Sequence, residues 1–246
     1  MPRFAADKLV GYAEALLQAS GLTAARARTV AEILVEGDLF DHTTHGLQLL
    51  PGYLKEIDAG SMTTGGDPET LADTGPAITW DGRRLPGPWL VVQALDLASQ
   101  RAVQYGTATV VIRRSHHIAC LAALVKEATD RGHLAILATS DPAFGFVAPY
   151  GGREPLLTPN PFAIGYPGRQ TPVLVDICAS ITTVSMARQK ASAGERFAHP
   201  WLMDSEGRPT TDPRVLETEP HGSLLLLGGL EYVEDRCMRK THAGQH

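Results

Sequence analysis

The chain has 246 residues, a net charge of −5, and a composition that is 43% hydrophobic and 20% charged. These values are typical of a soluble globular protein. The sequence has no dense Lys/Arg tract, which makes nucleic acid and anionic membrane surfaces unfavourable partners. No apolar run is long enough to cross a bilayer. Three cysteines fit reduced thiols in a cytoplasmic protein better than a disulfide framework.

Residues 5–60 are predicted to form three helices, because apolar residues recur there at helical spacing. Ser20-Gly21 ends the first helix, Thr23 caps the second, and the third ends near Gly60. Residues 61–76 are rich in Gly, Thr, Pro and Asp and are predicted to be a linker.

From residue 77 onward, strands and helices are predicted to alternate, which indicates an α/β domain. The predicted strands are 77–80, 107–113, 134–140, 162–166 and 172–177, and the predicted helices are 88–105, 119–131 and 182–193. Residues 141–160 are predicted to be a long loop, and such a loop in a compact domain usually carries function. Residues 199–220 are expected to be an extended loop, and the polar residues 233–246 a frayed tail.

The segment Ser115-His116-His117 lies where the strand 107–113 is expected to run into the first turn of the next helix. Helix amides disfavour a cationic ring, so a histidine there would be a neutral imidazole. A neutral imidazole can accept a proton near pH 7, which acid–base catalysis requires. A helix-capping Ser115 followed by two solvent-facing histidines is the alternative interpretation of the same residues.

Other candidate polar residues lie in or beside the 141–160 loop, where ligands collect at the ends of strands in an open α/β sheet. Ser140-Asp141 precedes the loop and Asn160-Pro161 ends it. Arg153 could clamp a carboxylate with two hydrogen bonds or be a solvated loop charge. Asp176 could hold a ribose hydroxyl, orient a histidine or cap the next segment. No glycine-rich phosphate motif follows a strand, so a nucleotide would need another cradle.

A zinc-dependent hydrolase is an alternative hypothesis. His42 and His45 are three residues apart, and His116, His117 and Cys120 are close in sequence, and Zn²⁺ accepts such ligands. The chain has no Cys-x-x-Cys or His-Glu-x-x-His pattern, and adjacent histidines seldom face the same ion. We therefore expect no metal site.

Seven motifs, taken in their order along the chain, resemble those of one known family. They are Asp38 with Thr44-His45-Gly46-Leu47 and Leu50-Pro51-Gly52-Tyr53-Leu54, Ser115-His116-His117-Ile118, residues 148–155, Asn160-Pro161, Asp176 before Ala179-Ser180, residues 201–213, and Leu227-Gly228-Gly229. The chain is similar to the malate/L-lactate dehydrogenase family that is unrelated to the Rossmann dehydrogenases. That family also includes ureidoglycolate, sulfolactate and diketogulonate oxidoreductases and reductases of cyclic imino acids. The resemblance covers residues 8 to about 232.

The resemblance implies an α/β fold with a non-Rossmann, mixed-sheet NAD(P)-binding domain and an N-terminal helical segment. Residues 1–72 would form the helical segment, which contributes to the substrate site and the dimer, and residues 73–232 the NAD(P)-binding domain. The implied reaction moves a hydride between NAD or NADP and the carbon next to a carboxylate, as in malate or lactate. A homodimer with sites built between its subunits is also implied.

The resemblance assigns roles to individual residues of this chain. The proton-transferring histidines of the family match His117 and His45. Positions that match the family's substrate pocket are Asn160 and Pro161, positions that match its dinucleotide site are Ser140, Asp141, Asp176 and Ile177, and Arg153 is the candidate carboxylate clamp.

The chain also departs from the family pattern. Ala119 stands where Gly is usual, and Thr158-Pro159 replaces the usual Gly-Thr, so Pro159 removes an amide donor. After Tyr232 the family continues with a Lys-Gly motif and a long helical region, whereas residues 233–246 are a divergent polar tail. We expect a truncated or frame-shifted member. An inactive member, acting at most as a dimeric scaffold, is the alternative to an active dehydrogenase.

Overall fold

The computed structural model describes residues 3–229, and the predicted tail at 233–246 lies outside them. The chain forms two compact units, which are described separately. The first is Met1–Leu137 with Ala163–Val175, and the second is Ala138–Phe162 with Asp176–His246. Residue 72, the predicted boundary between the helical segment and the NAD(P)-binding domain, lies inside the first unit. The division of the chain by function stays a prediction.

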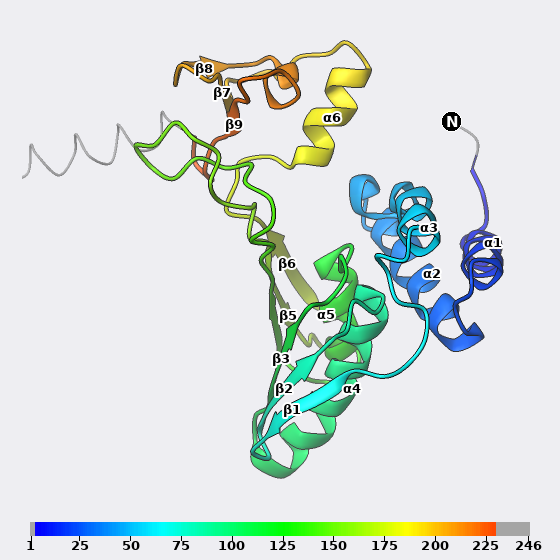
Figure 1. Ribbon diagram of the computed structural model, residues 1–246. Helices are drawn as coiled ribbons and strands as arrows, with labels where there is room; N and C mark the ends of the chain where they lie inside the picture. Colours follow the sequence, from blue (N-terminus) through cyan, green and yellow to red (C-terminus); the bar gives the residue numbers. More distant parts are fainter. Residues whose placement is uncertain (1–2, 230–246) are drawn as a thin grey trace, which may run out of the picture. The chain divides into compact units, whose positions relative to one another are not determined.

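The first unit begins with three helices, as the apolar spacing predicted (Figure 1). They are α1 (Ala6–Ala19), α2 (Ala24–Leu39) and α3 (Leu50–Asp58). Leu17 of α1 and Leu34 of α2 are fully buried in the same core, which also contains Leu90 and Leu124. Thr23 is the N-cap residue of α2, but its side chain makes no capping hydrogen bond. None of the described helices is both long and apolar enough to span a membrane.

Two three-stranded sheets follow, with strand orders β1-β2-β3 and β4-β5-β6. The strands are β1 (Glu69–Asp73), β2 (Ala77–Asp81), β3 (Thr109–Arg113), β4 (Ala135–Ala138), β5 (Phe162–Tyr166) and β6 (Val173–Ile177). β1 pairs antiparallel and β3 parallel with β2, so the sheet is mixed and the α/β prediction is confirmed. The prediction of a linker over 61–76 was wrong, because β1 lies within it. All five residues of β1 are exposed, so no alternation of apolar residues indicates the strand.

Helix α4 (Gly87–Tyr105) packs against β3 and α2, and helix α5 (Leu121–Thr129) packs against α4 and α2. Gly106 ends α4 in the left-handed conformation, with φ of 81°, which agrees with the predicted end of this helix at residue 105. α5 is shorter than the predicted 119–131. Its residues Leu124 and Val125 are fully buried, so this helix is a central element of the core.

The second unit contains α6 (Val184–Ser192) and a small sheet of strand order β8-β7-β9. The strands are β7 (Leu202–Met203), β8 (Pro209–Thr210) and β9 (Ser223–Leu224), and η3 (Pro213–Leu216) is a 3₁₀ helix. The predicted extended loop over 199–220 was therefore wrong, because strands of two residues are too short to show a period. The predicted loop over 141–160 has no regular strand or helix, although Val147 bridges Leu157.

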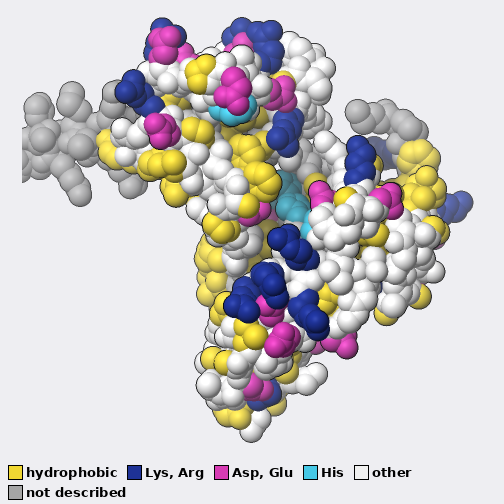
Figure 2. Space-filling view, in the orientation of Figure 1, with side chains coloured by type: hydrophobic (Ala, Val, Ile, Leu, Met, Phe, Trp, Pro, Cys, Tyr) yellow, Lys and Arg dark blue, Asp and Glu magenta, His cyan; other side chains and the backbone are white. Residues whose placement is uncertain are grey.

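Asp81, at the end of β2, is buried beneath arginine side chains. Figure 2 shows Lys and Arg side chains gathered beside the sheet β1-β2-β3. Arg114 and Arg113 bond the Asp81 carboxylate at 2.6 Å and 3.0 Å, and the Arg83 N–H donates to it over 2.9 Å. The Asp81 side chain is only 1% exposed. The hydrogen bond from Arg114, aided by those from Arg83 and Arg113, lowers the pKa of Asp81 to about 2.

This lowered pKa predicts a pH-dependent contribution to stability. An aspartate in the unfolded chain titrates near pH ~3.9, so the stabilisation by Asp81 is complete above about pH 4 and is lost as the pH falls toward the folded pKa of about 2. We expect Asp81→Asn to lower the urea midpoint at pH 7, and the difference from the wild type to shrink below about pH 4. Asp58→Asn, at an exposed position of α3, is the control. A difference between Asp81→Asn and wild type that stays constant from pH 7 to pH 3 would contradict the prediction.

Candidate active site

The histidine segment does not start a helix, and the sequence prediction on this point was wrong. Residues 114–120 are irregular, and α5 begins only at Leu121. Arg114 and Ala119 have φ of 53° and 61°, which helix formation excludes. The segment is held by backbone hydrogen bonds, among them His116 N–H to the oxygen of Leu85. A helix dipole acts only within the first turn, so it does not explain the environment of His117.

His117 is exposed, and its side chain contacts Tyr53 of α3. The Tyr53 hydroxyl oxygen lies 2.9 Å from Nδ1 of His117 and 3.2 Å from its backbone oxygen. The N–H of Ala119 points toward the same Nδ1, with the two nitrogens 3.3 Å apart. Burial raises the pKa of Tyr53, so its hydroxyl stays protonated. These contacts at Nδ1 therefore fix the orientation of the His117 ring.

His45 lies beside His117, with ring centroids 6.0 Å apart and an interplanar angle of 23°. It ends the 3₁₀ helix η1 (Thr43–His45), and Thr44 Oγ1 lies 2.9 Å from its Nδ1. Asp38 positions the next turn, because its carboxylate accepts the Leu47 N–H over 2.8 Å. A side chain at Gly46 would overlap that carboxylate. The Asp38 and His45-Gly46 motif thus has a structural reason, and the two predicted histidines come together.

Sequence reasoning gave no role in the dehydrogenase site to three neighbours of this pair, which are Tyr53, Glu56 and His116, whose ring is partly buried. His116 packs edge-on against Tyr53, with centroids 5.7 Å apart and an interplanar angle of 87°. Its Nε2 lies 3.9 Å from a carboxylate oxygen of Glu56. Burial lowers the pKa of His116, and Glu56 partly opposes this effect. The i, i+3 spacing of Tyr53 and Glu56 in a helix was the available sequence signal.

Tyr53, Glu56, His116 and His117 line an open cavity of about 270 Å³, whereas His45 is not among its lining residues. Its lining residues are Gln48, Leu49, Gly52, Tyr53, Glu56, His116 and His117. Ligand pockets for drug-sized molecules are about 300–1,000 Å³, so this cavity suits a small molecule. All its lining residues belong to the first unit.

The residues predicted to bind the nucleotide belong to the second unit. The N–H of Thr139 donates to Pro161 over 3.2 Å, and that of Ala179 donates to Pro159 over 2.7 Å. These bonds bring together the end of β4, the start of β5 and the segment after β6, which are the segments that carry the predicted residues. The residues predicted there are Ser140, Asp141, Asp176 and Ile177 for the dinucleotide, and Asn160 and Pro161 for the substrate.

Two features at this edge fit the polar groups of a ligand, one at the predicted substrate-binding residue Asn160 and one at the predicted cofactor-binding residues Ser140 and Asp141. Asn160 has φ of 45°, and its Oδ1 is buried without a hydrogen-bond partner. Non-glycine residues with such strain cluster at ligand sites, and an unpaired amide oxygen can accept from a carboxamide N–H or a ribose hydroxyl. Ser140 and Asp141 are exposed and offer a hydroxyl and a carboxylate. The residues present therefore fit the polar groups of the cofactor.

Two further predicted residues, Arg153 and Ile177, lie in the second unit. The side chain of Arg153 packs over Gly207, where an added Cβ would meet its Cδ at 2.5 Å. Ile177 is 46% exposed at the end of β6. Of the residues named in the zinc hypothesis, His42 and Cys120 have potential ligand atoms within 4.8 Å of each other, whereas His116 and His117 are not part of this group. The expectation of no metal site stays a prediction.

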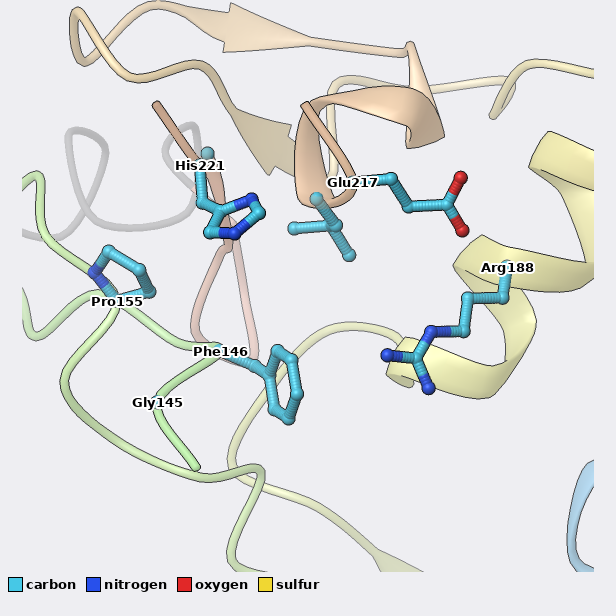
Figure 3. Close-up of a pocket in the computed structure, with 8 residues that line it drawn as sticks. Gly145, Phe146, Pro155, Arg188, Glu217 and His221 are labelled. Carbon is cyan, nitrogen blue, oxygen red and sulfur yellow. The ribbon is translucent and has the colours of Figure 1, made fainter. Parts of the chain in front are cut away.

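The second unit has a cavity of its own, of about 290 Å³, which the sequence did not indicate. Figure 3 shows Phe146, Arg188 of α6 and Glu217 at this cavity. His221 also lines it and lies 3.0 Å from Glu219. None of the residues predicted to be functional lines this cavity, so we retain the histidine cavity as the candidate active site.

Comparisons with known proteins agree with the predicted resemblance. Hydroxycarboxylate dehydrogenase B of Escherichia coli K12 is 30% identical over 224 residues, which cover 91% of this chain and 62% of the relative. A (2R)-3-sulfolactate dehydrogenase (NADP(+)) of Chromohalobacter salexigens is 30% identical, over 82% of this chain and 60% of the relative. The chain thus spans less than two thirds of the length of these curated relatives.

The fold is also shared with a solved structure. The crystal structure of malate dehydrogenase from Entamoeba histolytica matches with a TM-score of 0.89 and 27% identity, over 94% of this chain and 65% of that one. The sequence pattern of the malate/L-lactate dehydrogenase family matches residues 4–234. The histidine motifs and their order, the mixed α/β fold and this match agree, and the chain belongs to the malate/L-lactate dehydrogenase family.

Proposed function

We propose that the protein transfers a hydride between NAD(P) and the carbon next to a carboxylate. The substrate would be a 2-hydroxy acid or 2-oxo acid such as malate, lactate or a related compound. The approach of the His45 and His117 rings to 6.0 Å beside a small open cavity is the observation that carries the proposal. The names of the relatives, which are hydroxycarboxylate, sulfolactate and malate dehydrogenases, support this substrate class.

In the proposed mechanism His117 exchanges the proton of the substrate hydroxyl, and His45 assists. In oxidation, His117 accepts the hydroxyl proton, and in reduction it returns that proton to the oxygen. Asn160, Pro161 and Arg153 are the proposed substrate-binding residues, with the Arg153 guanidinium suited to a carboxylate.

Ser140, Asp141, Asp176 and Ile177 are the proposed cofactor-binding residues. The nicotinamide, when bound, supplies the redox chemistry, and the protein supplies position and electrostatics. The unpaired Oδ1 of Asn160 supports a ligand at this edge of the second unit. We also propose a homodimer in the cytoplasm, on the family resemblance and the low cysteine content.

The alternative is an inactive family member that serves at most as a dimeric scaffold. Its support is the departure from the family pattern at Ala119 and Pro159. A scaffold would keep the fold and lose cofactor affinity, so binding of the cofactor distinguishes the two proposals.

Binding of NADH or NADPH is expected to raise the melting temperature of the chain. A ligand at 100 times its Kd stabilises the folded state by about 2.7 kcal/mol, which corresponds to a rise of about 5–11 °C for a chain of this size. Differential scanning fluorimetry with a titration of each dinucleotide measures the rise. ADP-ribose, which lacks the nicotinamide, is the matched control ligand. If neither dinucleotide raises the melting temperature at millimolar concentration, the cofactor proposal is contradicted and the scaffold favoured.

A further inference from the structure

Nδ1 of His117 is approached by two groups of different chemistry. The backbone N–H of Ala119, 3.3 Å away, can only donate. The hydroxyl of Tyr53, 2.9 Å away, can donate or accept. The Ala119 amide alone would therefore favour the neutral ring that carries its proton on Nε2, whereas Tyr53 also allows the ring with its proton on Nδ1.

Proton exchange at Nε2 of His117 requires a proton on Nδ1 both in the neutral ring and in the imidazolium. Because Tyr53 engages Nδ1, Nε2 is the nitrogen that would exchange a proton with the substrate. A neutral ring that accepts a proton at Nε2 must hold its own proton on Nδ1, and the resulting imidazolium holds both. A neutral ring with its proton on Nε2 can neither accept a proton there nor lose one without becoming imidazolate.

We propose that Tyr53 is the positioning residue that keeps a proton on Nδ1 of His117. Its oxygen accepts the Nδ1–H bond over 2.9 Å, while its own proton is donated to the backbone oxygen of His117 over 3.2 Å. One hydroxyl thus satisfies both bonds, and the phenol carries no charge in either state of the ring. We infer that the 2.9 Å contact with Tyr53 outweighs the 3.3 Å contact with the Ala119 N–H, since a protonated Nδ1 has no lone pair left to accept from that amide. The role in catalysis rests on the proposed function, but the position of the proton does not.

The surroundings of Tyr53 favour this role. Its ring is buried, only 3% exposed, and this packing holds the hydroxyl beside Nδ1. The titratable groups nearby are His45, whose ring is 6.0 Å from that of His117, His116, which packs on the Tyr53 ring, and Glu56, beside His116. Replacing Tyr53 by Phe keeps all three groups and removes only the hydroxyl.

Nitrogen NMR of the full chain labelled with ¹⁵N in the imidazole rings tests the proposal, with the His117 signals assigned through His117→Gln. In the wild type we expect neutral His117 to carry its proton mainly on Nδ1. In Tyr53→Phe we expect the proton to move to Nε2 and the pKa of His117 to fall by about one unit, because the cation loses an acceptor. Tyr12→Phe, on an exposed face of α1, is the matched control and should leave both unchanged.

Two results would overturn the proposal. One is a folded Tyr53→Phe chain whose His117 tautomer and pKa equal those of the wild type. The other is a neutral wild-type His117 with its proton on Nε2 alone, a measurement that also decides the matter if Tyr53→Phe does not fold. Where the wild type reduces a 2-oxo acid, Tyr53→Phe should lower kcat and shift its pH profile while leaving the KM for the dinucleotide unchanged. If the wild type has the expected tautomer but transfers no hydride, the proposed function is contradicted, whereas the proposal for the Nδ1 proton stands.

Discussion

Replacing His117 by glutamine is expected to lower the rate of hydride transfer by about 10²- to 10⁴-fold, the usual contribution of a positioned acid–base group. Glutamine keeps hydrogen-bonding atoms but cannot exchange a proton. The rate is measured as the oxidation of NADH or NADPH at saturating 2-oxo acid, for example oxaloacetate or pyruvate. Because the loss concerns the chemical step, kcat should fall, and the rise in melting temperature caused by the dinucleotide should remain.

Further variants separate the acid–base role from a general loss of structure. His45→Gln is expected to lower kcat by a smaller factor, since its proposed role is to assist. His133→Gln, after α5 and outside the cavity, should leave kcat unchanged. A His117→Gln chain with the wild-type kcat would exclude His117 as the acid–base group. A wild type without activity toward any 2-oxo acid would favour the scaffold.

Gly87→Ala is expected to destabilise the protein by about 3 kcal/mol, the upper end of the cost of overpacking. A Cβ at this first residue of α4 would overlap the backbone oxygens of His116 and His117. A backbone segment cannot rotate away as a flexible side chain can, so either α4 or the histidine segment must shift. The expected fall in melting temperature is about 6–12 °C, measured by calorimetry at pH 7.

The change at Gly87 should also move the histidines, so the His45–His117 contact is expected to weaken. Gly11→Ala is the control, because Gly11 is in α1 and a Cβ there meets no atom within 4 Å. That change should stabilise the chain by up to about 1 kcal/mol through helix propensity. If Gly87→Ala were as stable as Gly11→Ala, the close approach at the start of α4 would not exist.

Much of the fold could be predicted because its long elements follow simple periodicity. The helices α1, α2 and α4 are amphipathic or are ended by a glycine such as Gly106, and β5 lies at the predicted residues 162–166. β1 and the two-residue strands β7 to β9 could not be predicted. β1 is exposed along its whole length, and two residues are too few to show alternation. Pairing with distant strands, which a local pattern does not contain, determines these elements.

The candidate site could be predicted in part. The order of the motifs identified His45 and His117, which the structure brings together. The helical start predicted at His117 was wrong, because the left-handed residue Ala119 and the bonds to the loop before α4 override the local helix signal. The bond between Tyr53 and His117 joins residues 64 positions apart, and no local pattern indicates it. The roles of the second-unit residues stay predictions.

Helix α3 supplies the cavity with Gly52, Tyr53 and Glu56, and the turn before it supplies Leu49. These positions recur every three or four residues, so they share one side of the helix. An insertion or deletion of a single residue before Tyr53 would rotate everything after it by about 100°. We expect related sequences to vary in the residue types on the opposite side of α3 and to conserve its length, because the helical pitch sets the distance between the pocket wall and the proton-exchanging ring.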